Sequence, residues 1–143
     1  VLGYNYRLTN IQAALGVAQM ERIDSILSSK LSIAKTYENG LKKIKGISLP
    51  PNQKWAKNIF WLYSILIEKD YPLKPKELVN KLKLDGIETR HLFPPVHTQP
   101  IYNTGQSLLV AENLHRKGIS LPSYGALKKK DIERIINIIS DNA

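Results

Sequence analysis

Residues 59–68 read IFWLYSILIE and combine aromatic with β-branched side chains. This composition is typical of a strand in the middle of a sheet. The segment therefore predicts the most buried strand of the domain, with Trp61 or Leu62 facing the core. Two shorter strands are expected beside it, at residues 87–92 and 119–121.

The residues before this strand carry the pattern of a long helix. Thr9 or Asn10 would cap its first turn, because short polar side chains accept hydrogen bonds from the free N–H groups there. Apolar residues then recur every three or four positions as far as Leu41. Because this length is unusual for one helix, we predict two segments with a bend near residues 20–24.

The residues after the strand predict three shorter helices. Pro75 opens the first, Ser107 caps the second, and the third covers residues 129–140. The alternation of helices and strands predicts an α/β domain in which helices pack on a small sheet. The hexapeptide KGISLP occurs at residues 45–50 and 117–122. Since the flanking residues differ, we interpret the two copies as local reuse of a helix stop and a short strand.

The composition is that of a soluble globular protein, with 43% hydrophobic and 23% charged residues. Of the net charge of +9, residues 41–86 carry +6, mostly as Lys spread along the chain. Nucleic-acid grooves favour Arg and stacked aromatic residues, so we disfavour nucleic-acid binding. No apolar run approaches the length of a membrane span, and the lack of Cys fits a reducing, cytoplasmic location. No signal-peptide pattern follows Val1, and the start resembles the middle of a longer protein.

The sequence lacks the glycine-rich loops that cradle phosphates and holds three histidines, His91, His97 and His115. A zinc site is disfavoured, because no acidic residue separates His91 from His97 and a third ligand is missing. His115 is expected to be structural or solvated. His97 lies in the loop PPVHTQP between prolines that hold its backbone. It either presents its imidazole to a ligand or bonds its own loop.

Asn5 and Arg7 lie two positions apart near the start of the chain. In an extended segment such residues face the same side. An amide beside a guanidinium suits an oxyanion or a phosphate, and a surface turn is the alternative interpretation.

Residues 3–24, GYNYRLTNIQAALGVAQMERID, closely resemble a motif of DegT-type sugar aminotransferases, which depend on pyridoxal phosphate. The resemblance continues through residues 57–67, 86–102 and 118–127, in order and with similar spacing. It thus covers nearly the whole chain. The second and third segments look most like the perosamine-forming members of this family.

This resemblance implies an α/β fold: the small C-terminal domain of a fold-type I aminotransferase, at residues 46–143, with helices packed on a mostly antiparallel sheet. Residues 1–45 would supply a long helix and contacts between domains and subunits. The parent enzyme would be a cytoplasmic homodimer with pyridoxal 5'-phosphate as its cofactor. It would move an amino group, with glutamate as the expected donor, to a keto group of a nucleotide-linked sugar for surface polysaccharide synthesis.

The family's catalytic lysine, which forms a Schiff base with the cofactor, would precede this segment. No catalytic residue is therefore expected in this chain, and the chain alone would be inactive. Asn5 resembles the family Asn that reaches the phosphate of the partner subunit's cofactor, and Arg7 is similar to the substrate-facing Arg beside it. His97 matches a loop His near the nucleotide-sugar pocket, with Arg90 and Phe93 lining the approach to it.

Two other interpretations stay open. The same fold would also serve a non-catalytic binding or regulatory module, and a basic nucleic-acid-binding domain is a third possibility. One departure from the family pattern concerns the last helix. Lys128 stands where the family usually has a Ser or Thr cap, which leaves the first residue of that helix undecided.

Overall fold

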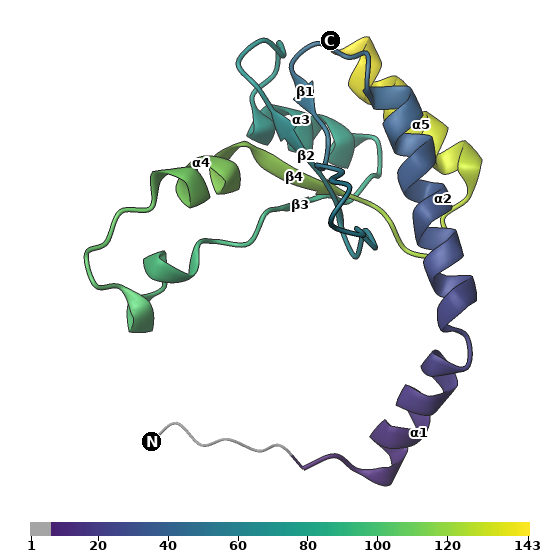
Figure 1. Ribbon diagram of the computed structural model, residues 1–143. Coiled ribbons are helices and arrows are strands. Elements are labelled where there is room, and N and C mark those ends of the chain that lie inside the picture. Colours follow the sequence, from purple (N-terminus) through teal and green to yellow (C-terminus); the bar gives the residue numbers. More distant parts are fainter. Residues whose placement is uncertain (1–6) are drawn as a thin grey trace.

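The computed structural model describes residues 7–143 as an α/β fold with two protruding arms (Figure 1). The elements follow one another as α1 (Asn10–Met20), α2 (Ile23–Leu41), β1 (Ile47–Ser48), β2 (Tyr63–Ile67), α3 (Pro75–Leu84), β3 (Arg90–His91), the 3-10 turns η1 (Val96–Thr98) and η2 (Pro100–Tyr102), α4 (Leu109–Lys117), β4 (Gly118–Leu121) and α5 (Lys129–Asp141). One arm is α1, and the other is the segment between β3 and α4, which carries η1 and η2.

The four strands form one sheet in the order β1-β2-β4-β3, and every neighbouring pair is antiparallel. This confirms the prediction of a small antiparallel sheet with helices packed on it. The two KGISLP copies supply β1 and β4, which lie on either side of β2. Ile47 of the first copy faces Ile67, and Ile119 of the second faces Ile65.

Residues 59–68 contain a strand, as predicted, but this strand is shorter than expected. The strand begins only at Tyr63, because Phe60 has a φ of 50° and interrupts the extended backbone. Of the two residues of which one was expected to face the core, Trp61 is 68% exposed, and Leu62 is half-buried and lies outside the core cluster. The side chains that do face the core alternate along β2, and they are Tyr63, Ile65 and Ile67.

The neighbouring strands also differ from the expectation. All four residues of β4 are buried, whereas β2 alternates between buried and half-buried positions. The most buried strand is therefore β4. The strand expected at 87–92 shortens to Arg90–His91, and it pairs with β4 at the edge of the sheet rather than with β2.

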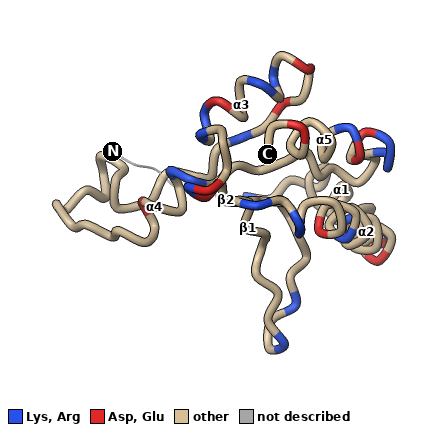
Figure 2. The backbone as a smooth tube through the Cα atoms, turned by 90° about the horizontal axis from the view of Figure 1, so that it is seen from above, with Lys and Arg blue, Asp and Glu red and all other residues tan. Residues whose placement is uncertain are grey.

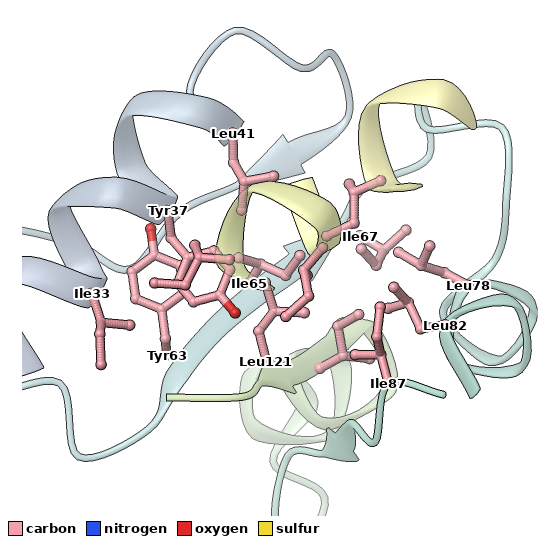
Figure 3. Close-up of a cluster of buried hydrophobic side chains, with 14 of the residues drawn as sticks. Ile33, Tyr37, Leu41, Tyr63, Ile65, Ile67, Leu78, Leu82, Ile87 and Leu121 are labelled. Carbon is pink, nitrogen blue, oxygen red and sulfur yellow. The ribbon is translucent and has the colours of Figure 1, made fainter. Parts of the chain in front are cut away.

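The core lies between the sheet and the helices α2, α3 and α5 (Figure 3). Tyr37 of α2 stacks on Tyr63 of β2 with ring centroids 4.8 Å apart, and its hydroxyl donates to the carbonyl of Pro122 at 2.8 Å. Ile135 and Ile139 of α5 close the same core from the C-terminal side.

The long N-terminal helix is divided as predicted, with the break at residues 21–22. Thr9 caps α1, since its hydroxyl accepts from the Gln12 N–H and the Gln12 side chain accepts from the Thr9 N–H. None of the α1 residues is buried, although the helix carries no charged side chain. Its large apolar side chains, and that of the residue before its cap, are exposed: Leu8, Ile11, Leu15, Val17 and Met20.

The structure settles the first residues of the helices α4 and α5. The N-cap of α4 is Leu108, so the expectation that Ser107 caps this helix is wrong. The last helix begins at Lys129 with Lys128 as its N-cap, which forms no side-chain capping bond.

Lys and Arg residues are distributed over α3, α5 and the connection between β1 and β2, and acidic residues are interspersed with them on the helices (Figure 2). Within residues 7–143, no helix is both long and apolar enough to cross a membrane.

Candidate functional site

Three of the five residues predicted to bind ligands lie on and after β3. Arg90 belongs to β3 itself, Phe93 follows it, and His97 lies in η1. Arg7 is exposed at the start of the described chain. Asn5 lies outside the described residues.

A cavity of about 710 Å³ opens beside Arg90, between β3, the end of β4 and α5. Its charged lining comes from α2, from β3 and the segment before it, and from α5: Lys30, Glu88, Arg90, Asp131 and Arg134. Trp61 and Leu62 border it from the start of β2. Basic, acidic and aromatic side chains therefore line the same cavity. Such a lining suits the binding of a polar small molecule.

Trp61 and Phe93 stack on each other at the border of this cavity. Their ring centroids lie 6.2 Å apart and the ring planes differ by 13°. Both rings are largely exposed, at 68% and 69%. The structure thus joins Phe93, which the resemblance singles out, to Trp61, one of the two residues considered for the core.

His97 is 9% exposed, and its Nε2 donates to the Oε1 of Glu112 at 3.1 Å. The same carboxylate accepts from the backbone N–H of Leu108 at 3.0 Å and from the hydroxyl of Ser107 at 3.4 Å. The hydrogen bond from His97 is the main reason why the pKa of Glu112 is lowered from its ordinary value. The His97 side chain is therefore bonded to α4 and not within its own loop, and a contact with substrate stays a prediction.

The other two histidines take no part in this site. His115 donates from Nδ1 to the carbonyl of Leu92 at 2.7 Å, which ties α4 to the end of β3. His91 is exposed on the edge strand. Within residues 7–143, no three His, Asp or Glu side chains lie close enough together to hold a metal ion.

Lys30 is the lysine of the cavity, and its ammonium group is occupied. It donates to the carbonyl of Trp61 at 2.8 Å, to the carbonyl of Ser123 at 2.5 Å and to the hydroxyl of Ser123 at 3.3 Å. Burial lowers its pKa below the ordinary value of 10.5. These three bonds fix α2 against the start of β2 and the end of β4.

This arrangement bears on the expected cofactor. Pyridoxal phosphate needs a lysine free to form a Schiff base, and Lys30 is held by three oxygens. Asn5, the residue expected to reach the cofactor phosphate, lies outside the described part. The cavity beside Arg90 therefore offers no lysine free to form that Schiff base.

Sequence analysis missed Lys30, Trp61 and Glu112. Their roles depend on partners 15 to 93 positions away, as the bonds from Lys30 to Ser123 and from His97 to Glu112 show.

Comparisons with known proteins agree with this fold. The profile of the DegT/DnrJ/EryC1/StrS aminotransferase family matches residues 1–140. The chain is 37% identical to a GDP-perosamine synthase of Escherichia coli O157:H7 over 142 residues and 32% identical to one of Caulobacter vibrioides over 139 residues. These alignments cover 99% and 95% of this chain and 38% of each relative, so the chain spans well under half of their length.

A solved structure shows the same arrangement. The Helicobacter pylori aminotransferase PseC, which is involved in the biosynthesis of pseudoaminic acid, superposes with a TM-score of 0.86 at 25% identity. The match covers 99% of this chain and 39% of that one. With a family profile matched from residue 1 to residue 140, the chain belongs to the DegT/DnrJ/EryC1/StrS aminotransferase family.

Proposed function

We propose that this chain forms the C-terminal part of a pyridoxal-phosphate-dependent enzyme that transfers an amino group to a keto group of a nucleotide-linked sugar. The family match over residues 1–140 carries this proposal. The perosamine-type product is proposed because relatives at 37% and 32% identity are GDP-perosamine synthases. Glutamate as donor and surface polysaccharide as destination are part of the same proposal.

The proposal assigns the cofactor chemistry to the part that the relatives have beyond the matched 38% of their length. Pyridoxal phosphate would supply the electron sink for amino transfer when bound there. This chain would contribute substrate binding through Arg7, Arg90, Phe93 and His97, and Asn5 would reach the phosphate of the partner subunit's cofactor.

The exposed apolar helix α1 supports the assignment of different roles to residues 1–45 and 46–143. A helix without charge and without buried residues leaves its apolar side chains in water unless another surface covers them. We assign residues 1–45 to contacts with the remainder of the enzyme and with a second subunit in a cytoplasmic homodimer. Residues 46–143 would then be the small domain that closes over the substrate.

A segment exchange tests this function. The homologous 142-residue part of the Escherichia coli relative is replaced by this chain, and the hybrid is assayed for amino transfer from glutamate to that relative's GDP-linked keto sugar. We expect an amino sugar product, detected by mass, and retention of the cofactor. A folded hybrid that holds the cofactor without making product would instead favour the non-catalytic module.

A further inference from the structure

We propose that Glu112 of α4 is a positioning residue for His97. Its carboxylate holds the imidazole ring in the form that carries its proton on Nε2, which leaves Nδ1 as the nitrogen that accepts a hydrogen bond. This inference rests on the proposed function, in which His97 contacts the substrate. It adds a residue that the family resemblance does not indicate, and it defines the kind of group that the ring can bind.

The bond between the two side chains determines which ring nitrogen carries the proton. The pKa of Glu112 is lowered, chiefly by the hydrogen bond from His97, so its carboxylate is ionised at neutral pH and can only accept. The Nε2 atom of His97, which lies 3.1 Å from the Oε1 atom of Glu112, must therefore donate. A neutral imidazole carries one ring proton, so Nδ1 is then an acceptor, and it has no hydrogen-bond partner within residues 7–143.

The carboxylate is itself held in place by the start of α4. The Oε1 atom that binds His97 also accepts from the N–H of Leu108 at 3.0 Å and from the hydroxyl of Ser107 at 3.4 Å. Glu112 lies in the first turn of the helix, where the partial positive charge of the N-terminus favours an anion. These contacts leave the carboxylate little freedom, so the orientation of the His97 ring is set by α4 and not by the arm alone.

A second histidine, on α4 itself, is fixed in the opposite form. His115, about one turn after Glu112, donates from Nδ1 to the carbonyl of Leu92 at 2.7 Å. Because a carbonyl can only accept, the proton of the neutral His115 ring lies on Nδ1. The arm leaves the sheet after β3 and returns to it through α4 (Figure 1), and the bonds of His97 and His115 hold its middle and its first residue on the same helix. The helix α4 therefore positions the arm together with the His97 ring.

The form of the ring defines what His97 can bind. A ring nitrogen without a proton accepts from a hydroxyl or another donor, whereas an ionised phosphate offers acceptor oxygens. Among residues 7–143, the one buried side-chain nitrogen or oxygen without a partner is the Oγ1 atom of Thr89, so the Nδ1 atom of His97 is not sealed inside the protein. Under the proposed function we therefore assign Nδ1 to a hydroxyl group of the substrate and not to its phosphates.

Nuclear magnetic resonance of the nitrogen-labelled chain locates the ring protons directly. At mildly alkaline pH, long-range correlations between carbon-bound protons and nitrogens of the ring show which nitrogen is protonated in each of the three histidines, and a Gln variant of each assigns the signals. We expect the proton of His97 on Nε2, that of His115 on Nδ1, and averaged signals for His91, which is exposed. A proton on the Nδ1 atom of His97 would overturn the proposal.

Variants of Glu112 test whether this carboxylate fixes the ring. Glu112→Ala removes the acceptor, so the Nε2 proton of His97 should be lost to exchange with water and its nitrogen signals should move toward those of His91. Glu112→Gln keeps an acceptor oxygen and should preserve the parent signals. Glu133→Ala, on the exposed surface of α5, is the matched control. Unchanged signals of His97 in Glu112→Ala would overturn the proposal, and the signals of His115 report whether α4 is still folded.

An active hybrid enzyme tests what the ring does for the substrate. His97→Gln places an amide nitrogen about as far from the backbone as Nε2 and can still donate to Glu112, but it has no acceptor in place of Nδ1. It should raise KM for the nucleotide sugar about 2- to 10-fold, the range for one hydrogen bond, and leave kcat unchanged. Glu112→Ala should raise KM at least as much, and Glu112→Gln should restore most of the parent value. Glu133→Ala should leave KM unchanged.

The failure of this inference and the failure of the proposed function are distinguishable. A hybrid that transfers no amino group rejects the proposed function, while the ring signals of the chain itself still decide whether Glu112 fixes His97. An active hybrid in which both His97→Gln and Glu112→Ala keep the parent KM rejects the positioning role and keeps the transferase. If Glu112→Ala does not fold, His97→Gln decides alone, because it retains the bond to Glu112.

Discussion

The Nε2 atom of His97 lies 3.1 Å from the Oε1 atom of Glu112, so a 3-10 turn of the protruding arm is tied to α4. The carboxylate of Glu112 also accepts from the backbone N–H of Leu108, immediately before that helix. One acidic side chain therefore holds the end of the arm and occupies the place that a capping side chain usually takes. Through His97 it reaches the middle of the arm as well.

This geometry predicts a pH dependence of stability. The pKa of Glu112 is lowered in the folded chain, so its contribution is present above the ordinary carboxyl value of 4.5 and is lost as the pH falls through the lowered value. We expect the midpoint of urea unfolding to fall from pH 6 toward about pH 3. The fall should be smaller in Glu112→Gln, because this variant has no carboxylate to protonate.

Glu133→Gln is the control for this experiment. Glu133 contacts Lys129 at 3.6 Å on the exposed surface of α5 and touches neither His97 nor Leu108. Glu68, whose pKa is lowered chiefly by its hydrogen bond from Lys117, contributes in both variants alike. If the unfolding midpoint falls with pH as steeply in Glu112→Gln as in Glu133→Gln, the bond between His97 and Glu112 does not contribute to stability.

A second prediction compares the effect on stability of a core residue in β2 with that of an exposed residue just before this strand. Ile65 is fully buried and faces Ile119 across the sheet. Ile65→Ala should lower the free energy of unfolding by about 2–5 kcal/mol, since it removes core volume. Trp61→Ala should change it by about 0.5 kcal/mol or less, because its ring lies outside the core. Urea unfolding measures both, and a larger loss in Trp61→Ala would contradict the assigned register.

How far the sequence leads depends on whether a feature is local. The break between α1 and α2, the capping of α1 by Thr9 and the helix that Pro75 opens all follow from residues within a few positions of one another. These predictions are confirmed. The predicted strand at residues 59–68 is longer than β2, because Phe60 takes a positive φ and interrupts the extended backbone. A phenylalanine rarely adopts such a φ, so the sequence gives no sign of it.

The site could be predicted only in part, because its contacts join distant segments. The resemblance indicates Arg90 and Phe93, and the structure places Arg90 in β3 and Phe93 in the arm that follows this strand. The stacking of Phe93 on Trp61 and the bond from Lys30 to Ser123 arise only when β2 and β4 pair in a particular register. Periodicity gives no register for strands of two to five residues.

A third prediction compares two glycines with the same backbone conformation. Gly46 and Gly86 have φ values of 77° and 75°. A Cβ at Gly46 would meet the backbone nitrogen of Tyr71, whereas a Cβ at Gly86 meets nothing within 4 Å. Gly86→Ala should cost about 1 kcal/mol for the unfavourable φ alone. Gly46→Ala should cost about 2–5 kcal/mol, because backbone must also move. If the two variants lose equal stability in thermal unfolding, the close approach of the Tyr71 backbone to Gly46 is contradicted.

The fourth prediction concerns Asn5 in the hybrid enzyme described above. If its amide donates to the cofactor phosphate, the bond is charge-assisted and contributes about 1.5–3 kcal/mol. Asn5→Ala should then weaken retention of pyridoxal phosphate about 10- to 150-fold. The effect on kcat should be smaller, since Asn5 would hold the phosphate and not the reacting carbon. Arg7→Ala should instead raise KM for the nucleotide sugar more than it disturbs the cofactor.

The same residue tests whether the active site is shared between subunits. Asn5→Ala subunits are mixed with subunits that lack the Schiff-base lysine, and mixed dimers are isolated with two different affinity tags. If Asn5 acts across the interface, one site of each mixed dimer lacks both groups and the other site is intact, so activity returns to about half of the parent value. If Asn5 acts within its own subunit, each substitution impairs a different site and activity stays low. Mixed dimers that form and remain inactive would exclude the contribution across subunits, while leaving the assignment of the family unchanged.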